Sequence, residues 1–183
     1  MKTNYVLPEV TFYPKEKDPS DNTIKIVEKT TADYFANKRV ILFSIPAPFD
    51  DGPGNQKALK YEKIYAQLLD LGIEEVYCIS TLDTHTMKLY KEHYRLSNLK
   101  MIPDGNATFT NAIGMLVTRK NLGLGSCSWS YAAVVDNGVV EKDFVEPDLC
   151  QEASGDVNLN HVSFAGEILD YCRIKQGLPP IER

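Results

Sequence analysis

Runs of apolar residues alternate along the chain with amphipathic segments, and this alternation predicts strands separated by helices. Residues 38–45 (KRVILFSI) and 74–81 (EEVYCIST) are short and rich in β-branched and aromatic residues, as buried strands are. Between them, residues 55–72 carry apolar side chains at three- and four-residue steps: Leu59, Ile64, Leu68 and Leu71. Gly72 is placed to end this helix. The order strand, helix, strand predicts two parallel strands joined by a crossover helix.

The middle of the chain continues the same alternation. Asp83 is placed to cap a helix that runs to about Tyr94, and residues 99–104 (LKMIPD) have the composition of a third strand. A turn at Asp104-Gly105-Asn106 follows, and a short helix is expected within 107–115.

The last third of the chain predicts a hairpin and a closing helix. Asn137-Gly138 lies between two apolar runs within residues 130–146, which is a strong hairpin signal. Within 161–177, five residues are spaced for one face of a helix: Val162, Ala165, Ile168, Leu169 and Cys172. Residues 14–22 and 147–160 are polar and are expected to be loops.

This order of elements is similar to that of the thioredoxin fold. It predicts an α/β protein with a central mixed sheet flanked by helices, and an N-terminal extension that forms its own hairpin. The length of 183 residues suits a single domain over residues 1–183.

Composition and charge narrow the functional classes. The chain has 25 acidic and 20 basic residues, a net charge of -5 and no dense Lys/Arg cluster, so we expect no nucleic-acid partner. The N-terminus lacks the apolar stretch of a signal peptide, and no segment is long and apolar enough to cross a membrane. We therefore expect a cytoplasmic protein with no membrane partner.

The cysteines and histidines do not suggest a metal site, a cofactor or a disulfide framework. The four cysteines, which have no CxxC spacing, are Cys78, Cys127, Cys150 and Cys172. The three histidines are far apart, and even His85 and His93 are not at the three- or four-residue spacing of helical metal ligands. Reduced thiols, no metal and no cofactor are expected.

Several blocks of the sequence resemble the type II peroxiredoxins, members of the alkyl hydroperoxide reductase/thiol-specific antioxidant superfamily. Residues 46–61 (PAPFDDGPGNQKALKY) resemble the active-site loop of that family, P-G-A-F-T-P-x-C-S, at Pro46 and Phe49. Similar blocks follow in the family's order at residues 76–88, 101–115, 125–148 and 162–171. The resemblance implies a thioredoxin-like fold, reduction of hydroperoxides by thioredoxin or glutaredoxin thiols, and a homodimer.

The residues that perform the family reaction are replaced in this chain. The family uses a cysteine nucleophile, an arginine and a threonine; Pro53 stands at the cysteine position, Ser130 at the arginine position and Asp50 at the threonine position. Ser130 removes a cation and Asp50 adds a negative charge, so the resemblance implies a catalytically degenerate site. Asp51 and Trp129 are expected to line the same pocket, with Pro46 and Phe49.

Two other functions stay open. An active thiol peroxidase or oxidoreductase would use a displaced cysteine: Cys127, next to the expected pocket, or Cys150. Alternatively the pocket binds a small ligand, with Asp50 and Asp51 favouring cationic or hydroxyl-bearing groups. Locally, Pro53 suits the first position of a helix capped by one of these aspartates, but the glycines on either side of it equally suit a mobile turn.

Overall fold

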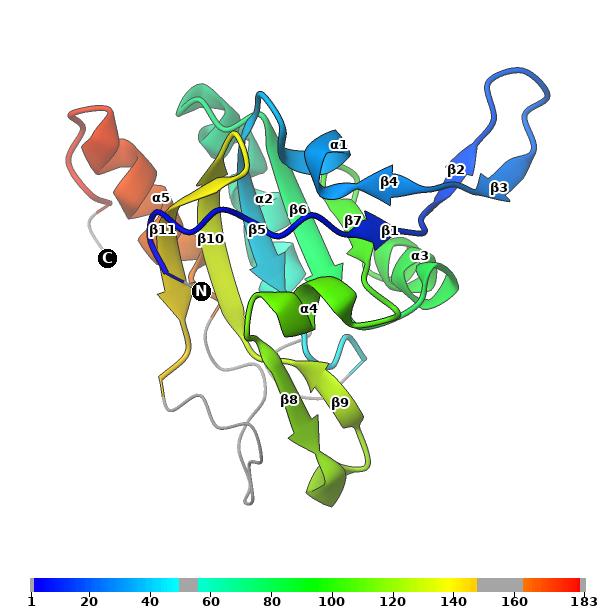
Figure 1. The fold of residues 1–183 in the computed structure, drawn as a ribbon. Helices are drawn as coiled ribbons and strands as arrows, with labels where there is room; N and C mark the ends of the chain where they lie inside the picture. The colour runs from blue at the N-terminus through cyan, green and yellow to red at the C-terminus, as the bar shows by residue number, and fades with distance from the viewer. Residues whose placement is uncertain (1, 50–55, 148–162, 182–183) are drawn as a thin grey trace.

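A computed structural model describes residues 2–49, 56–147 and 163–181, and within them a mixed sheet forms the centre of the molecule (Figure 1). The sheet has five strands in the order β11-β10-β5-β6-β7. Their bounds are β5 (Arg39–Ser44), β6 (Glu75–Ser80), β7 (Lys100–Pro103), β10 (Tyr131–Asp136) and β11 (Val139–Val145). β5, β6 and β7 pair in parallel, whereas β10 pairs antiparallel with both β5 and β11. The predicted parallel pair and the predicted hairpin are both confirmed.

Helices and loops cover both faces of this sheet because its strands are apolar on both sides. On β5, Ile41 and Phe43 join one core cluster, while Val40 and Leu42 join the other. The first cluster includes residues of the helices α2 (Lys57–Asp70), α3 (Thr84–His93) and α5 (Ala165–Lys175). The second includes residues of α1 (Thr31–Phe35) and α4 (Thr108–Ala112). None of the described helices has the length and apolar character needed to span a membrane.

The predicted helix and turn signals are confirmed at the positions where they were expected. The Asp83 carboxylate accepts hydrogen bonds from the backbone N–H groups of His85 and Thr86 and so caps α3. Asn137 and Gly138 have positive φ angles of 47° and 76°, which is the backbone twist that a two-residue hairpin needs.

Three small two-stranded sheets surround the central one. Their bounds are β1 (Thr11–Phe12) with β4 (Lys29–Thr30), β2 (Lys15–Lys17) with β3 (Ile24–Ile26), and β8 (Leu116–Arg119) with β9 (Gly125–Ser128). The pair β2–β3 is the predicted N-terminal hairpin and projects from the body (Figure 1). Residues 14–22 are therefore not a loop throughout, because they contain β2. The pair β8–β9, with the short 3-10 helix η2 (Lys120–Leu122) between its strands, was not predicted.

Candidate functional site

The candidate site lies where the carboxyl end of β5 meets the segment that enters β10. The Ser44 hydroxyl donates to the Trp129 carbonyl at 2.6 Å and accepts from the Tyr131 N–H at 3.0 Å. One strand away, the buried Ser80 hydroxyl donates to the Ile45 carbonyl at 2.8 Å. The Ser44 hydroxyl thus ties residues 129–131 to the end of β5, and the Ser80 hydroxyl ties Ile45 to the end of β6.

Lys57, the first residue of α2, reaches this segment from the helix side. Its side chain is 1% exposed, and Nζ donates to the Ser130 hydroxyl at 2.7 Å. Among the described residues, the Lys57 amine forms a hydrogen bond with Ser130 and no ion pair with a carboxylate. Burial lowers the pKa of Lys57 to about 7, and the charge of Glu146 opposes this effect. A cation at a helix N-terminus also opposes the helix dipole, so the fold holds Lys57 in an unfavourable place.

Lys57 changes the interpretation of the site. The replacement of the family arginine by Ser130 was expected to remove the cation, but the Lys57 amine lies in hydrogen-bonding contact with that serine. Because its pKa is about 7, this amine is partly protonated at neutral pH, so a titratable nitrogen from α2 lies beside Ser130. Sequence analysis missed Lys57, although its four-residue spacing to Tyr61, which is also buried, was a signal that it lies on the inner face of α2.

Tyr61, one helical turn beyond Lys57, is held by a ring stack and by a hydrogen bond of its hydroxyl group. Its ring stacks on Phe43 with centroids 4.0 Å apart, and its hydroxyl donates to the Ser163 carbonyl at 2.6 Å. Burial raises the pKa of Tyr61, so its hydroxyl stays protonated. Tyr61 therefore continues the buried face of α2 one turn beyond Lys57.

Part of the predicted site lies outside the described residues: Asp50, Asp51 and Pro53. Of the other residues expected in the pocket, Pro46 is buried after β5, while Phe49 is 48% exposed. The Phe49 ring lies edge-on to Tyr90, with centroids 5.7 Å apart, and packs near His93, so it is directed to α3.

Trp129 and Cys127 belong to the other face of the sheet. Trp129 is in the core cluster that contains α1 and α4, whereas α2 packs in the opposite cluster. Its indole N–H donates to the Glu146 carbonyl at 2.9 Å. The structure thus brings Ser130 to Lys57 but sends the neighbouring Trp129 side chain away from it.

The cysteines of the described residues are all buried and free: Cys78, Cys127 and Cys172. Burial raises the pKa of each thiol. The Arg119 guanidinium opposes this effect at Cys127, and Lys57 opposes it at Cys78, without reversing it. Cys78 and Cys172 are fully enclosed in the core, as expected, and Cys150 lies outside the described residues.

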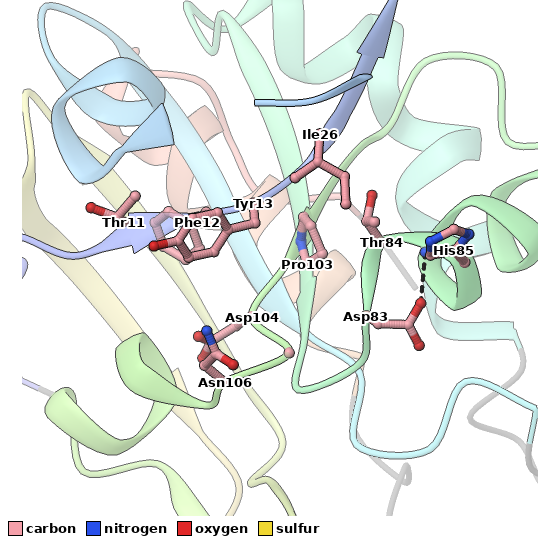
Figure 2. A pocket seen from close by; sticks show the side chains of 11 residues that line it. Thr11, Phe12, Tyr13, Ile26, Asp83, Thr84, His85, Pro103, Asp104 and Asn106 are labelled. Carbon is pink, nitrogen blue, oxygen red and sulfur yellow. Dashed lines mark hydrogen bonds between the residues drawn. The ribbon is translucent and has the colours of Figure 1, made fainter. Parts of the chain in front are cut away.

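A separate cavity of about 290 Å³ lies between β1 and the loops that follow β6 and β7 (Figure 2). Figure 2 shows Asp83 and His85 on one side of it and Asp104 and Asn106 on another. The buried Asp104 carboxylate is occupied by α4, since it accepts from the Thr110 hydroxyl at 2.7 Å and from the Thr110 N–H at 2.8 Å. The cavity contains none of the predicted site residues. In the described part of the chain, no group of His, Cys, Asp and Glu side chains is arranged to hold a metal ion.

A mixed sheet with helices on both faces, and a site at the carboxyl end of its central strand, define a thioredoxin-like α/β protein.

The model of the Redoxin family matches residues 8–157. A peroxiredoxin of Rhizobium etli is 43% identical over 143 residues, which cover 76% of this chain and 80% of that protein. Peroxiredoxin y4vD of Sinorhizobium fredii is 38% identical, with 82% and 81% covered. The structure of the Plasmodium falciparum antioxidant protein, a 1-Cys peroxiredoxin, is similar with a TM-score of 0.80 and 25% identity over 92% of this chain and 99% of that one. The chain belongs to the redoxin family and is a peroxiredoxin homologue, as its sequence motifs predicted.

Proposed function

We propose that this peroxiredoxin homologue does not reduce peroxides at the family site and that its pocket now serves to bind a small ligand. The observation that carries the first half is the state of its thiols. Pro53 stands where the resemblance places the nucleophilic cysteine, and each cysteine of the described residues is buried with a raised pKa. Peroxide reduction needs an accessible thiolate, and these thiols are protonated at neutral pH.

The second half rests on Lys57 and Ser130. The pair keeps a titratable nitrogen and a hydroxyl at the position where the family holds its arginine. Such a pair supports hydrogen bonding to a bound polar molecule, but it supplies no group that can attack the O–O bond of a peroxide and take up its oxygen as a sulfenate. Lys57 and Ser130 thus offer a bound ligand two polar groups that the sequence-based hypothesis, which rested on Asp50 and Asp51, did not include.

A displaced thiol is the competing function, and Cys127 is its best candidate. Arg119 acts on the Cys127 thiol in the direction that favours the thiolate, but burial of the side chain, which is 3% exposed, acts more strongly. Cys127 also lies in the core cluster opposite to α2, away from the helix that would carry a family nucleophile.

Peroxide consumption with thioredoxin and glutaredoxin reducing systems tests the proposal. The wild-type protein, Cys127→Ser and Cys150→Ser should all show only the background rate, and a sulfenic-acid trap should label no thiol faster than free cysteine. Turnover that one of these substitutions abolishes would overturn the proposal and identify the catalytic thiol.

We also propose that the protein is a homodimer, as the family resemblance implies, and that it is cytoplasmic, as expected from the N-terminal sequence. Sedimentation equilibrium at micromolar concentrations should give twice the monomer mass, and a concentration-independent monomer would reject the dimer. Cell fractionation checks the compartment.

A further inference from the structure

Arg119, at the end of β8, is a buried cation, and two of its three donor nitrogens have no hydrogen-bond partner. The side chain is 1% exposed, and its Nε and Nη1 atoms are buried without a hydrogen-bond acceptor. No carboxylate within the described residues forms an ion pair with it. A guanidinium is always charged in proteins, and buried charges are normally paired because an unpaired one is strongly destabilising. Among the described residues, the Arg119 guanidinium therefore has no anionic partner.

Trp129 covers one face of this guanidinium. The Arg119 Cζ atom lies 4.8 Å from the centre of the Trp129 ring, within the range of a cation–π contact. Trp129 is itself held by the hydrogen bond from its indole N–H to the Glu146 carbonyl. The aromatic ring can stabilise the charge from one side, but it accepts no hydrogen bond from the in-plane N–H groups, which point along the edge of the guanidinium.

We propose that Arg119 and Trp129 form a binding site for a small oxyanion, a carboxylate or a phosphate group, which accepts a hydrogen bond from Nε or from Nη1. Hydrogen bonds from a guanidinium N–H group to a carboxylate or phosphate oxygen are charge-assisted and therefore short and strong. The site does not depend on the proposed function, since Trp129 and Lys57 lie on opposite faces of the central sheet.

The position of the β8–β9 hairpin is compatible with entry of an anion. The two strands form a sheet of their own that is paired with no strand of the central sheet (Figure 1). A small displacement of the hairpin therefore breaks none of the central sheet's ladder hydrogen bonds. The nearby Cys127 thiol, whose pKa is raised by burial, is neutral at pH 7 and does not compete with the anion for Arg119.

Trp129 is the one tryptophan of the sequence, so its fluorescence reports directly on this site. The wild-type protein is titrated with inorganic phosphate and, separately, with acetate, at an ionic strength held constant with sodium chloride. We expect a saturable fluorescence change and a rise in Tm with at least one of the two anions, because a ligand that binds only the folded state stabilises it. A response to phosphate alone, or to acetate alone, identifies the group recognised. No response to either anion beyond the chloride control overturns the proposal.

Arg119→Met should abolish the saturable response, whereas Lys120→Met, which removes the exposed neighbouring charge, should keep it. Equal responses in wild type and Arg119→Met would reject the site.

Chemical modification gives a test that does not depend on the folding of a variant. Phosphate or acetate should slow the reaction of phenylglyoxal with Arg119 several-fold, measured by peptide mass spectrometry, while the exposed Arg95 reacts at an unchanged rate. Equal rates at Arg119 with and without the anions would also overturn the proposal.

Discussion

Replacing Lys57 with methionine removes a buried amine while keeping a side chain of similar length, so it isolates the free-energy cost of the charge. The pKa of Lys57 falls from 10.5 to about 7 on burial. Between these two values the unfolded chain binds one more proton than the folded protein, and the wild-type stability must therefore rise with pH in this window. Below pH 7 both states bind the proton, so the cost is complete there.

The size of the effect follows from the same shift. One pKa unit corresponds to about 1.4 kcal/mol, so the cost of burying Lys57 is roughly 4 kcal/mol at pH 7 and below about 1 kcal/mol at pH 10. Lys57→Met also loses the hydrogen bond to Ser130, which is worth about 1 kcal/mol. The variant should thus be more stable than the wild type by roughly 3 kcal/mol at pH 7 and of similar stability at pH 10.

Urea unfolding followed by circular dichroism, at each pH from 6 to 10, measures this difference directly. Other titrating groups are the same in both proteins and cancel in the comparison. Lys60→Met, which removes an exposed lysine of the same helix, is the matched control and should follow the wild-type curve. If the curves of the wild type and Lys57→Met run parallel across the window, the folded protein stabilises the charge of Lys57 and our account of the site is wrong.

Two further substitutions test hydrogen bonds that hold the helices in place. Glu141 accepts hydrogen bonds from Arg39 and Tyr171; although burial alone would raise its pKa, these bonds lower it to about 2 from 4.5. Its stabilising effect is present above pH 4.5 and is lost as the pH falls toward 2, so Glu141→Gln should cost about 2 kcal/mol in urea unfolding at pH 7 and clearly less at pH 3. Tyr61→Phe keeps the ring but loses the hydrogen bond to the Ser163 carbonyl, and should lower the unfolding free energy at pH 7 by about 1 kcal/mol. Equal stability of the wild type and Tyr61→Phe would show that this bond is not formed in solution.

The helices and strands that could be predicted from the sequence are those in which burial alone determines the spacing of apolar residues. β5 and β6 are nearly continuous apolar runs because they are covered on both faces, and the inner face of α5 shows the predicted helical spacing at Ala165, Ile168, Leu169 and Cys172. The hairpin turn at Asn137-Gly138 was equally readable, since few other residue pairs adopt two positive φ angles.

The elements that were missed contain polar residues in buried positions. β8 and β9 are short and carry Thr118, Arg119 and Ser126, so they show no alternation of apolar and polar residues. Arg119 is buried because an aromatic ring from a later segment covers it, and such a contact between distant residues leaves no local pattern. Lys57 was missed for a related reason: lysine is almost never fully buried, so it is read as part of the outer face of a helix.

Two buried basic side chains reach the same short segment, one on each face of the sheet: Lys57 contacts Ser130, and Arg119 contacts Trp129. Neither has a carboxylate partner in the described part of the chain, and a scaffold kept only for stability would gain by replacing both with apolar side chains. Costs of this kind usually persist at positions that bind or react. The segment before β10 is therefore not an inert part of the core, because a buried basic side chain reaches it from each face of the sheet.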